Sequence, residues 1–241
     1  MRNSKASSIQ KVILSHKHRF VFIHIYKVAG TSLTKALLPY GKELRNPLLV
    51  RLIEKFTGKC HTQNLAHLSA VEVRALLKPN EFREYFKFAF VRNPFDWIVS
   101  YYEYIRQNPF HYRHELVKEM DFGKFVQWRH EHEFIDKRHQ KDFVVDEKGV
   151  QLVDFIGRYE RLEEDFREIC ERIEVSAELP SLNHSHRKDL GVYYRDESII
   201  KLTREHLAPD FAFFDYKPEI CGLDLAKPLS HQSNTPSKSV C

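Results

Sequence analysis

The sequence predicts an α/β sandwich built around a parallel sheet. Two segments carry this prediction, residues 20–32 (FVFIHIYKVAGTS) and residues 86–100 (FKFAFVRNPFDWIVS). Each begins with an apolar, aromatic and β-branched run and ends in a small or basic cluster that opens a helix. Runs that are apolar on both faces are typical of central parallel strands. Strands that alternate with helices along a chain then indicate one α/β sandwich.

The remaining elements follow from local signals. The helix after the first strand begins near Thr31 or Ser32 and stops before residues 39–41, which contain Pro and Gly. Asn46 and Asn93 each precede a proline, which is the pairing of N-cap and first-turn residue that opens a helix. We therefore expect helices at 48–56, from 94 onward, at 70–77 behind a capping box, at 122–131, 162–173 and 197–207, and strands at 20–26, 86–92 and 150–156.

Length, composition and charge indicate one medium globular domain. The chain has 241 residues, 42% of them hydrophobic, which is enough for a substantial core. The net charge of +5 is compatible with anionic partners, although a solvated Lys and Arg surface gives the same number. We expect residues 1–18 to be a flexible N-terminal segment, 19–220 to be the folded domain and 221–241 to be a disordered tail.

The cysteines and the hydropathy pattern bear on location. Cys60, Cys170, Cys221 and Cys241 form no CxxC pair, which fits passive thiols or a reducing compartment. No stretch approaches the run of about 18 apolar residues that crosses a bilayer. We therefore expect a cytoplasmic protein without a transmembrane segment. A membrane anchor outside this sequence would leave the same appearance, and peripheral membrane contact stays open.

The loop after the first strand has the composition of an anion-binding turn. Ala29 and Gly30 let the backbone approach a ligand, while Thr31 and Ser32 offer hydroxyls and free N–H groups at a helix start. Lys27 adds a flexible cation. An ordinary capped turn explains the same residues about as well. The loop is not a Walker A motif, because the lysine precedes the glycine and no Gly-Lys-Ser/Thr is present, which favours an anion transfer that requires no metal.

The second segment offers a second anion site. Arg92 leaves the end of the strand, and Ser100 lies two turns into the following helix. An arginine fork and a hydroxyl can close on one phosphate from two elements, although a surface arginine and a plain helix cap explain this segment alone. Because carboxyl ends of strands in α/β sheets bind anions, the two segments together predict a ligand that is anionic at both ends.

Together the two segments resemble the sulfotransferases that use 3′-phosphoadenosine 5′-phosphosulfate (PAPS), especially the carbohydrate sulfotransferases and their bacterial relatives. Residues 24–32 are similar to that family's 5′-phosphosulfate loop (H-I-P-K-x-x-G-T-S), and residues 90–100 to its 3′-phosphate motif (F-V-R-N-P-x-D-R-x-V-S). The likeness continues through 154–160, 179–183 and 193–196, and covers roughly residues 20–216. It implies a P-loop-like three-layer sandwich with a central parallel sheet.

The resemblance also implies roles for the matched residues. Lys27 would contact the phosphosulfate and neutralise charge on the departing phosphate oxygen. The 5′-phosphate would be bound by Ala29, Gly30, Thr31 and Ser32, and the 3′-phosphate by Arg92 and Ser100, with Arg187 as a further candidate. The chain departs from the pattern at two positions. Tyr26 replaces a proline, which removes one φ restraint, and Trp97 stands where many members have arginine, which bears on adenosine or acceptor contacts.

Transfer to a hydroxyl also needs a base, for which histidine is suited near neutral pH. His67 precedes the helix that Ser69 caps, and bacterial members of the family have a histidine in a similar place. His67 is therefore the expected catalytic base, with His61 as the nearest alternative and His24 expected to be packed in the first strand. From the residues alone, a plain surface or capping histidine explains His67 more simply.

Residues 101–150 are the expected helical, acceptor-side region. The stretches 106–113 and 129–138 are basic and aromatic, which suits a wall around a glycan or glycolipid, although a solvated helical face explains them equally well. Two other functions remain open: a P-loop kinase or NTPase, and a non-catalytic module that binds polyanions. No nucleic-acid motif is visible, so nucleic acid is not an expected partner.

Overall fold

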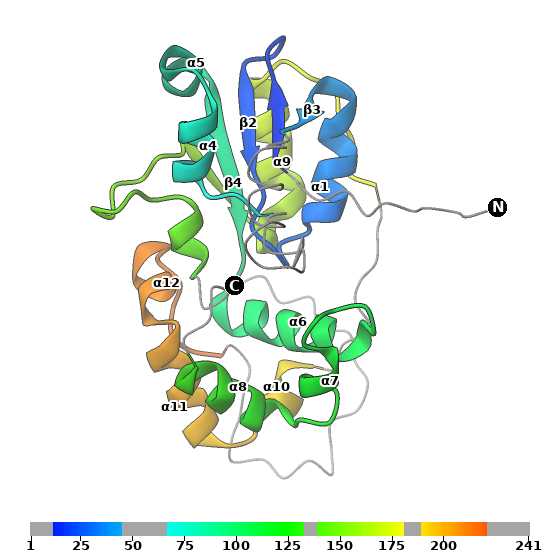
Figure 1. Ribbon diagram of the computed structural model, residues 1–241, viewed down its shortest axis with the longest axis vertical. Helices are drawn as coiled ribbons and strands as arrows, with labels where there is room; N and C mark the ends of the chain where they lie inside the picture. The colour runs from blue at the N-terminus through cyan, green and yellow to red at the C-terminus, as the bar shows by residue number, and fades with distance from the viewer. Residues whose placement is uncertain (1–11, 45–66, 133–138, 181–188, 221–241) are drawn as a thin grey trace, which may run out of the picture.

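A mostly parallel sheet forms the centre of the protein. The computed structural model describes residues 12–44, 67–132, 139–180 and 189–220. Within these residues five strands form one sheet in the order β3-β1-β2-β4-β5 (Figure 1). The parallel strands are β2 (Phe20–Ile23), β4 (Phe86–Val91) and β5 (Phe155–Arg158). The predicted α/β class is confirmed, and β2 is central as expected.

The edge beyond β2 is antiparallel, which corrects two expectations. Strand β1 (Ile13–Ser15) pairs antiparallel with β2 and with the short strand β3 (Lys42–Glu43). The sheet is therefore not wholly parallel. Residues 1–18 are also not flexible throughout, because the apolar residues 12–14 are buried against the core and Ile13 lies opposite Phe22.

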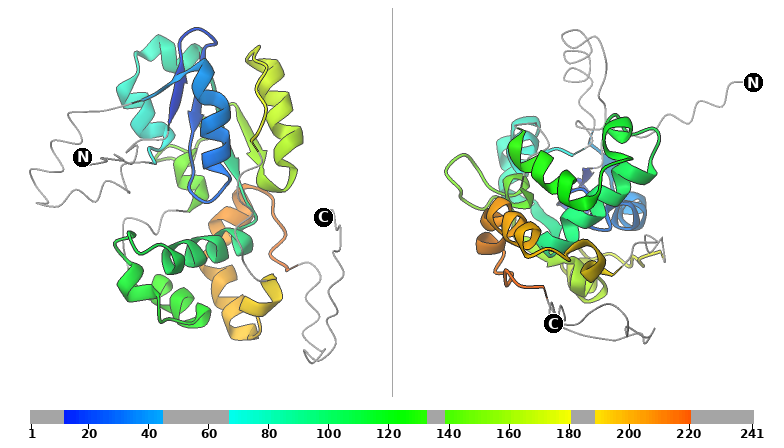
Figure 2. Two further views of the ribbon diagram at one scale, coloured as in Figure 1. Left: turned by 90° about the vertical axis from the view of Figure 1, so that its right-hand side faces the viewer. Right: turned by 90° about the horizontal axis from the view of Figure 1, so that it is seen from below.

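The helices form two groups. Their bounds are α1 (Gly30–Leu37), α4 (Ala70–Leu76), α5 (Pro79–Glu84), α6 (Pro94–Gln107), α7 (His114–Val117), α8 (Phe122–Glu131), α9 (Leu162–Arg172), α10 (Leu190–Tyr193), α11 (Glu197–His206) and α12 (Ala208–Phe213), with 3₁₀ turns at Leu38–Tyr40, Gln140–Phe143 and Tyr159–Arg161. Figures 1 and 2 show α1 and α9 on one side of the sheet and α4 and α5 on the other. Helices α6, α8, α11 and α12 gather beyond the carboxyl ends of the parallel strands.

Several local predictions are confirmed. Ser69 forms a capping box with Glu72, and the Asn93 side chain accepts a hydrogen bond from the Phe95 N–H over 3.0 Å. Helix α8 has the predicted bounds. The strand expected at 150–156 is wrong in position, since the backbone N–H of Asp154 donates to the Lys87 carbonyl and strand pairing runs from 155 to 158. The helix expected at 48–56 lies outside the described residues.

The core joins the sheet to both helix groups. Phenylalanines from the parallel strands pack across neighbouring strands, with ring centroids of Phe22 and Phe88 5.4 Å apart. Trp97 of α6 is fully buried and its ring packs against that of Tyr26, so the helix that follows β4 is fixed against the loop that follows β2. Among the described residues, none of the helices combines the length and apolar character needed to cross a membrane.

Candidate active site

The loop between β2 and α1 has a strained backbone and an uncapped helix end. Lys27 and Ala29 both adopt left-handed φ values, 66° and 61°, a conformation that costs a residue with a side chain roughly 1 kcal/mol or more. No side chain of the described residues caps α1, and its first turn contains no acidic residue. The positive end of the α1 dipole is therefore presented at the loop, which favours an anion there.

The sequence predicts Gly30 as a position where the backbone approaches a ligand, whereas the structure shows that packing against His24 requires a glycine there. A Cβ at this position would lie 1.5 Å from Nε2 of His24, so the buried His24 ring occupies the space that any other side chain would need. His24 is packed, as predicted. Thr31 is exposed at the start of α1, whereas Ser32 is buried and its N–H donates to the Ala29 carbonyl over 2.9 Å.

The second motif contacts this loop directly. The indole Nε1 of Trp97 donates to the Tyr26 carbonyl over 2.8 Å, and Nη1 of Arg92 donates to the Lys27 carbonyl over 3.3 Å. Two consecutive carbonyls of the first motif are thus held by side chains of the second. The structure brings together the two segments that the sequence predicts as the two ends of one anion site.

Arg92 is a buried residue with a fixed orientation, not a surface arginine. Its side chain is only 4% exposed, its Nε pairs with the Asp96 carboxylate, and its guanidinium lies 3.9 Å from the centroid of the Tyr159 ring. The Gln140 side chain bonds both the N–H and the carbonyl of Arg92. Ser100 is buried further along α6. These contacts orient the guanidinium before any ligand arrives.

The Lys27 side chain extends toward α6. Its Nζ lies 4.1 Å from the ring centroid of Tyr104, which is 39% exposed. His111 packs edge-on to Tyr104 with ring centroids 5.6 Å apart. Burial, together with the positive charges of Arg113, His114 and Lys27, lowers the pKa of His111 to about 4, so its imidazole is neutral near pH 7. Sequence reasoning did not single out Tyr104 or His111.

His67 lies beside the same loop with a defined tautomer. Its Nδ1 is 2.9 Å from the His24 carbonyl oxygen, which can only accept a hydrogen bond. Nδ1 therefore carries the proton, and the lone pair is on Nε2. The His67 ring packs edge-on to His24 at 4.7 Å and to Tyr26 at 5.7 Å between centroids. This is the arrangement that orients a histidine base.

Tyr26 connects the loop to the acceptor-side helices. Its ring lies 4.9 Å from Trp97 and 5.1 Å from Tyr101 between centroids. Burial raises the pKa of Tyr26, and the charge of Arg129, together with its hydrogen bond to the Tyr26 side chain, opposes that shift. Sequence reasoning placed Arg129 in the basic wall without giving it a role. The candidate residues His61 and Arg187 lie outside the described residues.

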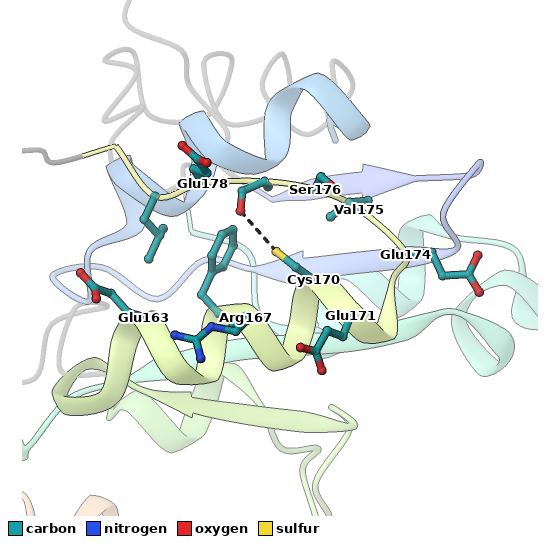
Figure 3. A pocket seen from close by; sticks show the side chains of 11 residues that line it. Glu163, Arg167, Cys170, Glu171, Glu174, Val175, Ser176 and Glu178 are labelled. Atoms are coloured by element: carbon teal, nitrogen blue, oxygen red, sulfur yellow. Dashed lines mark hydrogen bonds between the residues drawn. The ribbon is translucent and has the colours of Figure 1, made fainter.

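A separate pocket on α9 does not coincide with this site. It has a volume of about 610 Å³ and lies between α9 and the segment that follows it (Figure 3). Four of its lining residues are acidic, namely Glu163, Glu171, Glu174 and Glu178. Four carboxylates disfavour a phosphorylated ligand, and none of the predicted site residues that the structure describes lines this pocket.

Comparison with known proteins identifies the family. The sequence matches the model of the sulfotransferase family over residues 10–217. The chain belongs to this family. This sulfotransferase-family chain is 26% identical to carbohydrate sulfotransferase 14 of Mus musculus over 182 residues, which cover 68% of the chain and 46% of that protein. It is also 26% identical to carbohydrate sulfotransferase 14 of Danio rerio over 186 residues, covering 68% and 48%.

The chain spans about half the length of the curated relatives that it matches. No solved structure gives a significant match. The matched range contains both motifs and His67, so the family assignment rests on the part of the chain that builds the site.

Proposed function

We propose that this chain is a sulfotransferase that moves a sulfuryl group from PAPS to a hydroxyl of a carbohydrate or glycoconjugate. The observation that carries the proposal is the junction of the two motifs, in which Arg92 and Trp97 hold the carbonyls of Lys27 and Tyr26. This junction combines an uncapped helix end, a lysine and an oriented guanidinium in one place, as a ligand with anions at both ends requires.

The two halves of the junction would each take one end of the donor nucleotide. The 5′-phosphosulfate would lie at the start of α1, where Ala29 to Ser32 supply backbone and hydroxyl donors and Lys27 supplies charge. The 3′-phosphate would be bound by Arg92 and Ser100, with Arg187 as a further candidate. Because Asp96 and the Lys27 carbonyl already engage two nitrogens of Arg92, the guanidinium enters the complex preoriented. We further propose that the strand, loop and helix at this point form a P-loop-like anion site.

The reaction follows from these positions. The acceptor oxygen attacks sulfur, an oxygen–sulfur bond forms, and the bond from sulfur to the 5′-phosphate oxygen breaks. The electron pair of that bond stays on the phosphate oxygen, where Lys27 stabilises the new charge. The proton of the hydroxyl passes to Nε2 of His67, the nitrogen that its hydrogen bond to His24 leaves unprotonated. Adenosine 3′,5′-bisphosphate is released.

The acceptor side favours a sugar. Exposed or half-exposed aromatic rings gather around α6 and α7, with Phe110 90% exposed and Tyr104 next to the Lys27 side chain. The guanidinium of Arg113 lies 4.8 Å from the Tyr112 ring centroid and 5.2 Å from that of Trp128. Aromatic faces stack on sugar rings and guanidinium groups bind anionic substituents, and the relatives are carbohydrate sulfotransferases by name.

A thermal-shift comparison tests the donor assignment. Adenosine 3′,5′-bisphosphate should raise the melting temperature of the chain, and ATP should raise it less. Arg92→Lys keeps the charge but removes the fork, and it should weaken the effect of the bisphosphate more than that of adenosine 5′-monophosphate. Stabilisation by magnesium and ATP but not by the bisphosphate would indicate a kinase or NTPase. Stabilisation by heparin alone would indicate a polyanion-binding module.

A further inference from the structure

Tyr26 is a partly buried junction between the loop predicted to bind the donor (residues 26–32) and two helices on the acceptor side. Its carbonyl accepts from the Trp97 indole, and its ring packs against the rings of Trp97 and Tyr101 in α6. The family pattern that these residues resemble has a proline and an arginine where this chain has Tyr26 and Trp97. The two departures are therefore in direct contact with each other.

Helix α8 supplies a guanidinium to this junction. Arg129 is 3% exposed, and its Cζ lies 5.3 Å from the Trp97 ring centroid and 5.1 Å from that of Tyr101. It also hydrogen-bonds the side chain of Tyr26. Among the described residues, Nε and Nη2 of Arg129 have no hydrogen-bond partner. A buried charge held mainly by ring faces is a poor source of stability, so the presence of Arg129 here points to a role other than stabilising the fold.

The positions of the two predicted reacting groups, Lys27 and His67, depend on where Tyr26 lies. Lys27 is the next residue and adopts a left-handed conformation, so a shift of the Tyr26 backbone redirects its side chain. The His67 ring packs edge-on to the Tyr26 ring. A displacement of about 1 Å in such groups can reduce a rate about a hundredfold.

We propose that Arg129 is a positioning residue of the transfer reaction. By holding Tyr26 against α6, it fixes Lys27 and His67 relative to each other from a helix of the acceptor-side region. The inference rests on the proposed function, because that function gives Lys27 and His67 their roles. Through Arg129, helix α8 then orients the loop of residues 26–32 that is proposed to bind the donor.

Three variants and one control test the proposal. Arg129→Met removes the charge and the hydrogen bond at similar volume, Arg129→Lys keeps the charge, and Tyr26→Phe removes only the hydroxyl. Lys124→Met is the control, since Lys124 is a largely exposed cation on the same helix that pairs with Asp121. We expect kcat to fall about tenfold in Arg129→Met and Tyr26→Phe, less in Arg129→Lys, and not in the control.

Two further measurements distinguish a variant that has lost the positioning of the loop from one that has failed to fold. Affinity for adenosine 3′,5′-bisphosphate should change by less than about threefold, because the α1 end and Arg92 remain. Hydrogen exchange in peptides covering residues 26–32 should be faster in Arg129→Met and Tyr26→Phe than in wild type and control. The double variant should lose no more kcat than either single variant, since both remove one interaction. If Arg129→Met does not fold, Tyr26→Phe decides the question.

The outcomes distinguish this inference from the proposed function. Wild-type kcat and exchange in Arg129→Met and Tyr26→Phe, or additive losses in the double variant, would overturn the positioning role while sulfotransfer stands. If wild type binds no bisphosphate and transfers no sulfate, the proposed function fails, and the exchange measurement still decides whether Arg129 orders the loop.

Discussion

Replacement of Gly30 by alanine should destabilise the protein through a single side chain. An added Cβ would lie 1.5 Å from Nε2 of His24, whereas real Cβ atoms essentially never come within 3.0 Å of such an atom. The His24 ring cannot withdraw freely, because it stacks on Phe22 at 5.7 Å and meets His67 at 4.7 Å between centroids. Overpacking of this kind costs about 1–3 kcal/mol, or about 2–12 °C in melting temperature for a domain of this size.

Urea unfolding followed by circular dichroism measures this loss. Gly123→Ala is the control, since the nearest atom to its new Cβ is the flexible end of Ile199 at 3.2 Å, and its stability should change little. In a His24→Ala background the obstruction is gone, so Gly30→Ala should then cost less than about 0.5 kcal/mol. Equal stability of Gly30→Ala and wild type, or an equal loss in both backgrounds, would refute the reasoning.

Three other changes have definite expected outcomes. His67→Ala should abolish turnover and leave bisphosphate affinity within about threefold, measured by isothermal titration, and full activity would refute the base assignment. Arg92→Ala should lower the affinity for adenosine 3′,5′-bisphosphate at least tenfold and that for adenosine 5′-monophosphate much less; an equal loss for both would contradict the 3′-phosphate assignment. Burial raises the pKa of Asp210 to about 6. Because the pKa in the folded state exceeds the ordinary value, the protonated Asp210 carboxyl contributes its full stabilisation below about pH 4, and this stabilisation is lost as the pH rises through 6. The free energy of unfolding of wild type relative to Asp210→Asn should therefore fall by up to about 3 kcal/mol across that window. No fall in that difference would contradict a raised pKa.

Much of the fold could be predicted because its central elements carry strong local signals. Strand β2 is a continuous apolar run and β4 is one interrupted by a single lysine, and the caps at Ser69 and Asn93 set helix starts to the residue. Strand β1 was not predicted because it has three residues, too few for a periodic pattern. Short helices such as α10 and α12 were missed for the same reason.

In the candidate site, too, local sequence predicted some residues and could not predict the contacts between distant ones. Lys27 and Arg92 follow strand ends, so their meeting could be predicted from parallel pairing alone. The packing reason for Gly30 could not, because the group in its way is the side chain of His24 in the preceding strand. Arg129 meets Tyr26 across a long stretch of sequence, and no local pattern encodes that contact. The signal that could have found it is the pair of bulky aromatic residues, Tyr26 and Trp97, at the two departures from the motif.

The most direct test of the account is transfer of labelled sulfate from PAPS to a panel of glycans, with wild type and Lys27→Ala compared in parallel. We expect wild type to label at least one glycan and to release adenosine 3′,5′-bisphosphate in equal amount. Lys27→Ala, folded by circular dichroism, should lose at least about a hundredfold of that rate, because Lys27 is the charged side chain proposed to stabilise the departing phosphate oxygen. Undiminished transfer by Lys27→Ala, or stoichiometric binding of PAPS without transfer to any hydroxyl, would contradict the account.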